Sequence, residues 1–319
     1  MGLPANILRT VFFGSPPFAV NSFRVLLERS KKPLALVTAP PRRAGRGRKE
    51  VPNPLVEMAE AAQVPVLRPE NPQDSNFLDE LRGLQPNLGI VVSFGKILSA
   101  ELLEIPTLGC INLHGSLLPR WRGASPVQAA ILAGDSESGV CVQKMVLKLD
   151  AGAVLASRSV VLAPDERAPE LFDRLARLGA DLLDSFLDQV GHGPLPTGVE
   201  QKQDAATICH RIRSPEGKVS WEETSRHVDR LVRAMAGWPW AQIHLQGGDV
   251  VRILRGEVSA YSEVGESKPG DIVRVEGGIF VCCGDGVYRI DQLQRAGRAA
   301  LSAAEFLRGC AWKIGDTLA

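Results

Sequence analysis

Two polar side chains, those of Asn112 and His114, stand two residues apart in residues 110–114, a segment that is typical of a strand. Side chains at i and i+2 of a strand point to the same face, so this amide and this imidazole are expected to project together. An imidazole can give or take a proton near neutral pH. Gly115 follows and allows a sharp turn and close approach of a ligand to the backbone. The alternative is that both side chains only cap a strand end through ordinary hydrogen bonds.

A carboxylate follows the next expected strand, in the run Lys148-Leu149-Asp150-Ala151-Gly152. Asp-x-Gly is a frequent turn sequence, so Asp150 could be a turn residue and nothing more. Brought beside His114, its charge would favour the imidazolium form and fix the orientation of the ring. Asn112, His114 and Asp150 are therefore the candidate catalytic set.

Alternating strands and helices surround this set through the first 190 residues. Strands are expected at residues 7–13, 34–38, 64–67, 88–92, 110–114 and 140–147, and helices at residues 20–27, 52–62, 76–84, 125–132 and 169–190. Such alternation predicts an α/β fold, with a doubly wound, parallel, Rossmann-like sheet covered on both faces. Open sheets of this kind bind ligands at the carboxyl ends of their strands, where Asn112 and His114 stand.

The pattern of alternating strands and helices ends before residue 207, and short strands separated by turns are expected after it. Residues 192–198, rich in Gly and Pro, break regular structure. Short strands are then expected at residues 241–245, 250–256, 271–275, 279–283 and 287–292, separated by Gly and Pro turns. This rhythm predicts a small C-terminal β-barrel, OB-like in size. We expect three parts: a catalytic domain over residues 1–190, a linker over 191–207 and the barrel over 208–319.

Positive charge gathers near the N-terminus of a chain whose net charge is only +1. Residues 1–50 hold ten Lys and Arg against two Glu, and five of these cations fall within residues 42–49. Such a cluster can mark a contact with a polyanion, although cation runs in loops are often no more than solvated surface.

Several classes of protein receive no support from the sequence. No apolar run reaches the roughly 18 residues of a membrane span, and the N-terminus does not read as a signal peptide. The six cysteines form no Cys-x-x-Cys pair, which favours reduced thiols in a cytoplasmic protein. The five histidines lack metal-ligand spacing, and no Gly-x-Gly-x-x-Gly follows the first strand.

Beyond these patterns, the sequence resembles the folate-dependent formyltransferases. The resemblance is carried by Gly14-Ser15-Pro16-Pro17-Phe18-Ala19, Ser93-Phe94-Gly95-Lys96-Ile97-Leu98, the block 112–123 and Leu149-Asp150-Ala151-Gly152. Residues 39–49 are similar to a basic loop found in the members that act on methionyl-tRNA. The motifs Val219-Ser220-Trp221, Gly237-Trp238-Pro239-Trp240 and Ala296-Gly297-Arg298 extend the resemblance into the second domain.

The resemblance implies an activity and its substrates. It implies transfer of a formyl group from 10-formyltetrahydrofolate to the methionine of the initiator Met-tRNA, by a monomer that needs no metal. Asn112 and His114 would donate hydrogen bonds to the developing oxyanion, and Asp150 would hold His114 and help to move a proton. The folate would contact Phe94, Gly95, Ile97 and Leu98 and also Ser116, Leu117, Leu118 and Pro119, although Ile97 and Leu98 could equally be packing residues. The tRNA would contact Arg42, Arg43, Arg46, Arg48 and Lys49.

The chain departs from the family pattern in two loops, and other functions stay open. Ser15-Pro16-Pro17 stands where the family usually has Thr-Pro-Asp, and Ala39-Pro40-Pro41-Arg42-Arg43 where it has Gln-Pro-Asp-Arg-Pro. These changes leave the catalytic set untouched and affect only the loop contacts. The alternatives are a formyltransferase acting on an amino sugar or an amino nucleotide, a hydrolase of the folate donor, and a tRNA-binding module without catalysis.

Overall fold

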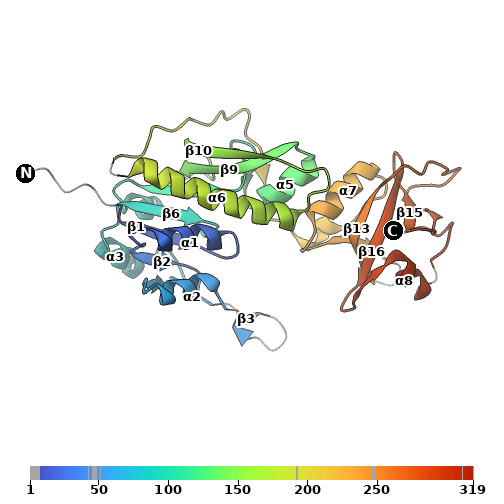
Figure 1. The fold of residues 1–319 in the computed structure, drawn as a ribbon, viewed down its shortest axis with the longest axis horizontal. Helices are drawn as coiled ribbons and strands as arrows, with labels where there is room; N and C mark the ends of the chain where they lie inside the picture. The colour runs from blue at the N-terminus through green and yellow to red at the C-terminus, as the bar shows by residue number, and fades with distance from the viewer. Residues whose placement is uncertain are drawn as a thin grey trace, which may run out of the picture. The chain divides into compact units, whose positions relative to one another are not determined.

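The computed structural model describes residues 8–41, 43–44, 49–50, 52–191, 193–245, 249–310 and 312–318. The chain forms two compact units that interleave along the sequence. The first comprises Met1–Pro126, Glu137–Val161 and Phe172–Cys209, and the second Val127–Ser136, Leu162–Leu171 and His210–Ala319. Figure 1 labels the elements of both units.

The first unit is built on a seven-stranded sheet in the order β10-β9-β7-β6-β1-β2-β5 (Figure 1). Its strands are β1 (Thr10–Gly14), β2 (Ala35–Val37), β5 (Val66–Leu67), β6 (Leu88–Val92), β7 (Cys110–His114), β9 (Glu137–Lys144) and β10 (Val154–Val161). The helices are α1 (Ala19–Glu28), α2 (Pro54–Ala61), α3 (Ser75–Gly83), α4 (Ala100–Glu104), α5 (Pro126–Ala133) and α6 (Ala168–Val190), the last two shared with the second unit. Two short pairs, β3 (Arg43–Ala44) with β4 (Lys49–Glu50) and β8 (Arg122–Gly123) with β11 (Ile208–Cys209), complete it.

Both faces of the central strands are covered, as the continuous apolar runs predicted. Every residue of β1 and of β6 is buried. Phe12 stacks on Phe23 of α1 with ring centroids 5.0 Å apart, whereas Phe13 joins a cluster with Phe77 and Leu81 of α3. Adjacent strand residues point to opposite faces, so these two phenylalanines anchor the helices of opposite layers. The Rossmann-like α/β fold is confirmed.

One edge of the sheet differs from the parallel arrangement expected. The pairs β1–β2, β1–β6, β2–β5 and β6–β7 are parallel, but β9 runs antiparallel to both β7 and β10. Residues 145–153 join β9 to β10 without a crossover helix, a connection that only an antiparallel pair permits. Strand β10 was not expected from the sequence, because its centre, Ser157-Arg158-Ser159, is polar and exposed.

The second unit carries a curled antiparallel sheet in the order β12-β13-β16-β15-β14, with β17 paired to β16. Its elements are β12 (Ala241–His244), β13 (Val250–Ser259), β14 (Ile272–Arg274), β15 (Ile279–Cys282), β16 (Val287–Arg295), β17 (Ala300–Ser302), α7 (Ser225–Ala234), α8 (Ala303–Arg308) and a 3-10 turn (Ser214–Gly217). The pairing of β13 with β16 shifts register near Arg255, and such bulges bend long strands. The curled sheet makes half of the expected OB-like barrel.

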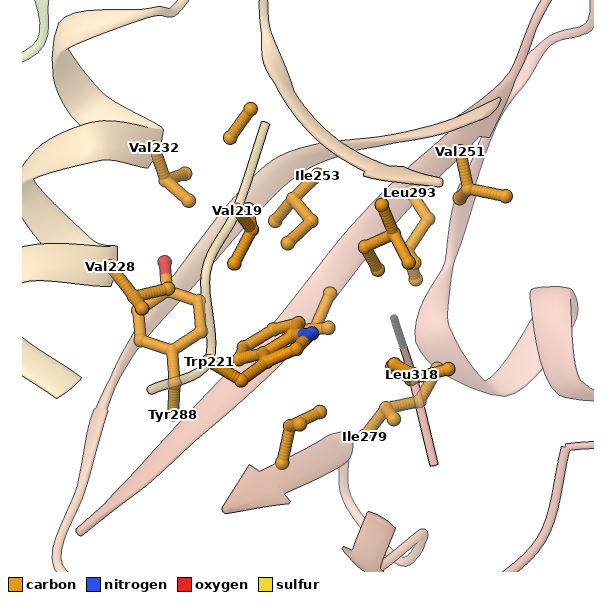
Figure 2. Packing of buried hydrophobic residues seen from close by; sticks show 14 of the residues in the cluster. Val219, Trp221, Val228, Val232, Val251, Ile253, Ile279, Tyr288, Leu293 and Leu318 are labelled. Atoms are coloured by element: carbon orange, nitrogen blue, oxygen red, sulfur yellow. The ribbon is translucent and has the colours of Figure 1, made fainter. Parts of the chain in front are cut away.

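Helix α7 fills the concave side of this sheet and was not expected from the sequence. Its apolar residues Val228, Leu231 and Val232 recur at helical spacing and pack with Trp221 and Tyr288 into one buried core (Figure 2). The hydroxyl of Tyr288 has no hydrogen-bond partner in the described part of the chain, and burial raises its pKa well above the ordinary value. This core gives the second unit its own source of stability.

The described helices include none that is long and apolar enough to cross a membrane. All six cysteines are free thiols, five of them buried.

Candidate active site

Three loops meet at the carboxyl edge of the parallel strands. They follow β1 at residues 15–18, β6 at residues 93–98 and β7 at residues 115–123. The backbone N–H of Ser15 donates to the Val92 carbonyl at 3.4 Å, and its hydroxyl donates to the Phe94 carbonyl at 3.3 Å, which ties the first loop to the second. The chain builds outward from β1 to β2 and β5 on one side and to β6 and β7 on the other. In open α/β sheets, ligands bind at the carboxyl edge where the strand order reverses in this way.

His114 lies at this edge with both ring nitrogens directed at defined groups. The residue is 6% exposed, and its Nε2 lies 2.9 Å from the carbonyl oxygen of Trp121. A carbonyl can only accept, so Nε2 carries a hydrogen and donates it. Nδ1 faces Asp150 Oδ2 at 3.7 Å, which is longer than a hydrogen bond. Nδ1 is therefore the nitrogen left for a substrate, and a proton on it makes the ring cationic.

Asp150 is held in a left-handed backbone conformation, with φ at 48°. Aspartate tolerates this region better than most residues because its short polar side chain bonds locally. Its Oδ2 accepts from the backbone N–H of Gly123 at 2.9 Å, and its Oδ1 accepts from Gln143 Nε2 at 2.8 Å. The structure thus brings together His114 and Asp150, which are far apart in the sequence, and fixes the carboxylate from both oxygens.

Asn112 shares the strand face of His114 and keeps its amide available. The residue is partly exposed, and its side chain makes no hydrogen bond to any other described residue. It stands directly opposite Gln143 in the β7–β9 ladder, so the two amide side chains lie on the same face. Capping of the strand end, the alternative for this residue, is not what its side chain does here.

Cys141 stands opposite His114 in the same ladder, which places a thiol near the imidazole. Burial raises the pKa of Cys141 to about 11, so the group stays a thiol at neutral pH. The thiolate is the nucleophilic form of cysteine. At neutral pH Cys141 is therefore a poor nucleophile.

The expected folate residues of the β6 loop separate into core and surface. Phe94 packs edge-on against Phe13, with ring centroids 5.6 Å apart, and Leu98 is buried in the same cluster. The burial of Leu98 supports the packing alternative for it. Ile97 is 82% exposed, and Gly95 turns the loop with φ at 73°. Of the four expected residues in this loop, Gly95 and Ile97 are exposed.

The expected folate residues of the β7 loop divide in the same way. The Ser116 hydroxyl is buried and donates to the Arg120 carbonyl at 2.6 Å, so it shapes the loop from inside. Leu117, Leu118 and Pro119 are partly exposed. The Pro119 carbonyl accepts from the backbone N–H of Thr207 at 3.3 Å, which binds this loop to the segment after α6.

The basic segment is described only in part. Arg42, Arg46 and Arg48 lie outside the described residues, and Arg43 and Lys49 belong to the antiparallel pair β3–β4.

Two glutamines at the site were not among the residues expected from the sequence. Gln143 follows the apolar run 140–142 of β9 and stands opposite Asn112, and this position is the signal that could have marked it. Gln201 lies in the presumed linker, and no local pattern marked it. Across the described ranges, no group of three His, Cys, Asp or Glu side chains is placed to hold a metal ion.

Solved structures show where this fold occurs elsewhere. A sugar 3N-formyl transferase, WlaRD, superposes with a TM-score of 0.67 at 16% identity, over 92% of this chain and 100% of that one. HypX from Aquifex aeolicus, solved with tetrahydrofolic acid, superposes with a TM-score of 0.59 at 19% identity, over 98% of this chain and 50% of that one. At these identities the likeness concerns the fold alone.

Sequence comparison is far more specific. The family models described as formyl transferase and as formyl transferase, C-terminal domain, match residues 8–187 and 211–311. The methionyl-tRNA formyltransferase of Geobacter metallireducens is 41% identical over 98% of both chains. That of Parvibaculum lavamentivorans is 37% identical over 98% of this chain and 100% of its own. The chain therefore belongs to the formyl transferase family and, within it, to the methionyl-tRNA formyltransferases.

Proposed function

We propose that this chain transfers the formyl group of 10-formyltetrahydrofolate to the methionine amino group of initiator Met-tRNA, for translation initiation. Relatives with the name of this activity align over almost the whole chain. The observation that carries the proposal is the arrangement at the end of β7. The Asn112 amide has no protein partner among the described residues, and His114 Nδ1 is free of any bond shorter than 3.7 Å.

Asn112 and His114 stabilise the charge that develops on the formyl oxygen. A formamide is a poor acylating agent, and attack by an amine places negative charge on its oxygen. The Asn112 amide donates one hydrogen bond to this oxygen, and protonated Nδ1 of His114 donates another. Because Nε2 is already bonded to the Trp121 carbonyl, the ring cannot rotate away and is ready before the substrates bind.

Asp150 orients His114 and handles the proton of the attacking amine. The new bond joins the formyl carbon to the methionine nitrogen, the bond to the folate nitrogen breaks, and one proton must pass from the first nitrogen to the second. Asp150 Oδ2 lies beside the imidazole and can relay this proton, directly or through a water molecule.

We place the folate at the loops after β6 and β7. Ile97 offers an exposed apolar side chain to a flat ring, beside the backbone of Gly95. The partly exposed Leu117, Leu118 and Pro119 face solvent from the other loop. Phe94, Leu98 and Ser116 act from beneath by shaping the two loops.

The tRNA binds to residues outside the folate-binding loops. We assign the contact to Arg42, Arg43, Arg46, Arg48 and Lys49 and to the barrel over residues 208–319, while residues 1–190 carry the chemistry and residues 191–207 join the two. Charged contacts to phosphates supply affinity to such complexes. The protein acts as a monomer in the cytoplasm, where its tRNA substrate is made and used.

A direct assay tests the proposal. Purified protein is incubated with 10-formyltetrahydrofolate and one acceptor at a time: initiator Met-tRNA, an amino-sugar nucleotide, an amino nucleotide, or water alone. We expect formyl-methionyl-tRNA to form and the other acceptors to remain unmodified. Formylation of the sugar or the nucleotide in its place, or hydrolysis of the donor without transfer, would refute the assignment.

A further inference from the structure

Gln201 is a buried residue in a segment whose neighbours are exposed. It is 7% exposed, whereas Lys202 and Gln203 on its carboxyl side are open to solvent. Its Nε2 lies 2.8 Å from the Asp150 carbonyl and 2.7 Å from the Gly152 carbonyl. One side-chain amide thus holds both ends of the three-residue turn that carries the catalytic carboxylate.

Arg122 fixes the orientation of this amide. The arginine is 4% exposed, and its Nε donates to Gln201 Oε1 at 2.9 Å. A guanidinium has only donors, so it selects the oxygen of the amide and leaves the NH₂ group turned to the two carbonyls. Gln203 Oε1 accepts from Arg122 Nη1 at 3.1 Å and steadies the arginine from the other side.

The amide and the carboxylate form one connected unit. Gln143 holds Asp150 Oδ1, the Gly123 backbone holds Oδ2, and Gln201 holds the backbone of Asp150 itself. Asp150 stands at a φ of 48°, a region that residues other than glycine occupy uncommonly, although aspartate does so more readily than most. Without the Gln201 amide, rotation of the turn would move Oδ2 away from His114 Nδ1.

We propose that Gln201 is a positioning residue for formyl transfer: oriented by Arg122, its amide holds the Asp150 turn so that the carboxylate faces His114. Gln201 acts through Asp150 and touches no substrate, and the inference rests on the proposed function. The segment expected to be only a linker therefore completes the active site.

The substitution Gln201→Glu separates this role from simple support of the buried arginine. A carboxylate still accepts from Arg122, but it has no N–H to donate and presents an oxygen to the two carbonyls. The melting temperature is therefore expected to fall, as in the control variant below, because a buried carbonyl loses its donor in both. We expect kcat to fall about 10- to 100-fold, because misplacing a reacting group by about 1 Å costs about that much. The KM for each substrate should stay within about threefold of wild type.

Two further variants complete the experiment. Gln201→Leu removes the acceptor of Arg122 as well, and we expect it to lower both kcat and the melting temperature. Gln242→Glu is the matched control, since Gln242 is also buried and its amide donates to the Pro239 carbonyl at 3.0 Å, far from the site in the sequence. It should lose stability and keep kcat.

The outcomes separate the two proposals. A wild-type protein that formylates Met-tRNA, with Gln201→Glu at full kcat, would overturn the positioning role and leave the proposed function standing. An equal loss of kcat in Gln201→Glu and Gln242→Glu would also overturn it, because the effect would then be general. A wild-type protein inactive on Met-tRNA would overturn both.

Discussion

At the scale of single residues, the site depends on which nitrogen of His114 is already occupied. Nε2 donates to the Trp121 carbonyl, and this bond turns Nδ1 towards Asp150 and the substrates. The sequence could not predict which nitrogen of His114 is bonded. The spacing of Asn112 and His114 placed both side chains on one face of a strand, but it did not indicate which groups the imidazole ring would contact. The Nε2 bond predicts that removal of the ring affects the chemical step far more than stability.

We expect His114→Ala to lower kcat by about 10² to 10⁴ while the protein stays folded, since that is the usual contribution of a positioned acid or base. Single-turnover formylation with both substrates saturating measures the effect, and circular dichroism checks the fold. A variant that turns over at the wild-type rate would remove His114 from the mechanism.

The substitution Asp150→Asn tests the role of the negative charge of Asp150, because the asparagine side chain has nearly the same shape. The amide keeps the bulk of the carboxylate, but it loses the negative charge that faces His114. Its NH₂ group also replaces one of the two oxygens that accept from the Gly123 N–H and from Gln143 Nε2. We expect a large loss in kcat with unchanged binding of the folate donor, measured by fluorescence titration. If activity persists and only the melting temperature falls, Asp150 is a turn residue after all.

The cysteines provide a residue-scale prediction that does not depend on the activity. Burial raises the pKa of Cys110 and of Cys283 to about 12 and that of Cys141 to about 11, whereas Cys310 is partly exposed. The reactive thiolate forms only as pH rises towards these values, so at pH 8 about one Cys141 in 10³ is ionised. Iodoacetamide with mass spectrometry should label Cys310 first. Labelling of Cys141 at a similar rate in the native protein would contradict the burial.

At the scale of elements, the sequence predicted the strands and helices that have a clear apolar periodicity. It missed the elements whose formation depends on tertiary contacts. The apolar runs located β1 and β6, and the helix expected over residues 52–62 is α2, which begins at Pro54. The cap of α2 was not expected: Asn53 Oδ1 accepts from the Leu55 N–H at 3.0 Å. The polar strand β10 exists because β9 offers it an edge, and no local signal marks it. Helix α7 carries an apolar pattern, but a short one of only ten residues, ahead of the first strand of the barrel.

The turn between β9 and β10 is the element on which the site depends most. A methyl group on Gly152 would lie 1.7 Å from the Lys144 carbonyl oxygen, a backbone atom of β9 that cannot swing aside. We therefore expect Gly152→Ala to push the Asp150 turn off the strand, to cost about 1–3 kcal/mol of stability and to lower kcat. Urea unfolding and steady-state kinetics measure both effects.

Gly83→Ala is the matched control for this prediction. Gly83 ends α3, and an added methyl group meets no atom within 4 Å, so the change should be neutral or stabilise the protein by up to about 1 kcal/mol. Equal stability of the two variants would show that the β9–β10 turn has room to adjust, and the geometric account of Asp150 would then fail.

At the scale of the whole molecule, charge is distributed so that one segment dominates the attraction for a polyanion. Residues 201–319 hold 16 Lys and Arg against 15 Asp and Glu, so the second domain carries almost no net charge. Residues 1–50 hold ten cations against two acids. We infer that the barrel contributes shape and local contacts, whereas residues 42–49 supply the electrostatic part of tRNA binding and deliver the acceptor end to His114.

Neutralising Arg46 and Arg48 together, as Arg46→Gln with Arg48→Gln, should raise the KM for Met-tRNA. It should also flatten the dependence of log(kcat/KM) on log[salt], by up to roughly 0.7–0.9 per lost phosphate contact, because fewer counterions are released on binding. Binding of 10-formyltetrahydrofolate should not change.

The matched control removes two exposed cations that also lie within residues 1–50, as Arg24→Gln with Lys31→Gln. It should leave the KM for Met-tRNA and the salt slope near wild type. Kinetics at several salt concentrations give both quantities for all three proteins. Equal salt slopes in the two double variants would mean that only net charge matters. An unchanged slope in the Arg46/Arg48 double variant would mean that residues 42–49 are solvated surface, and a small-molecule acceptor would again be an alternative to tRNA.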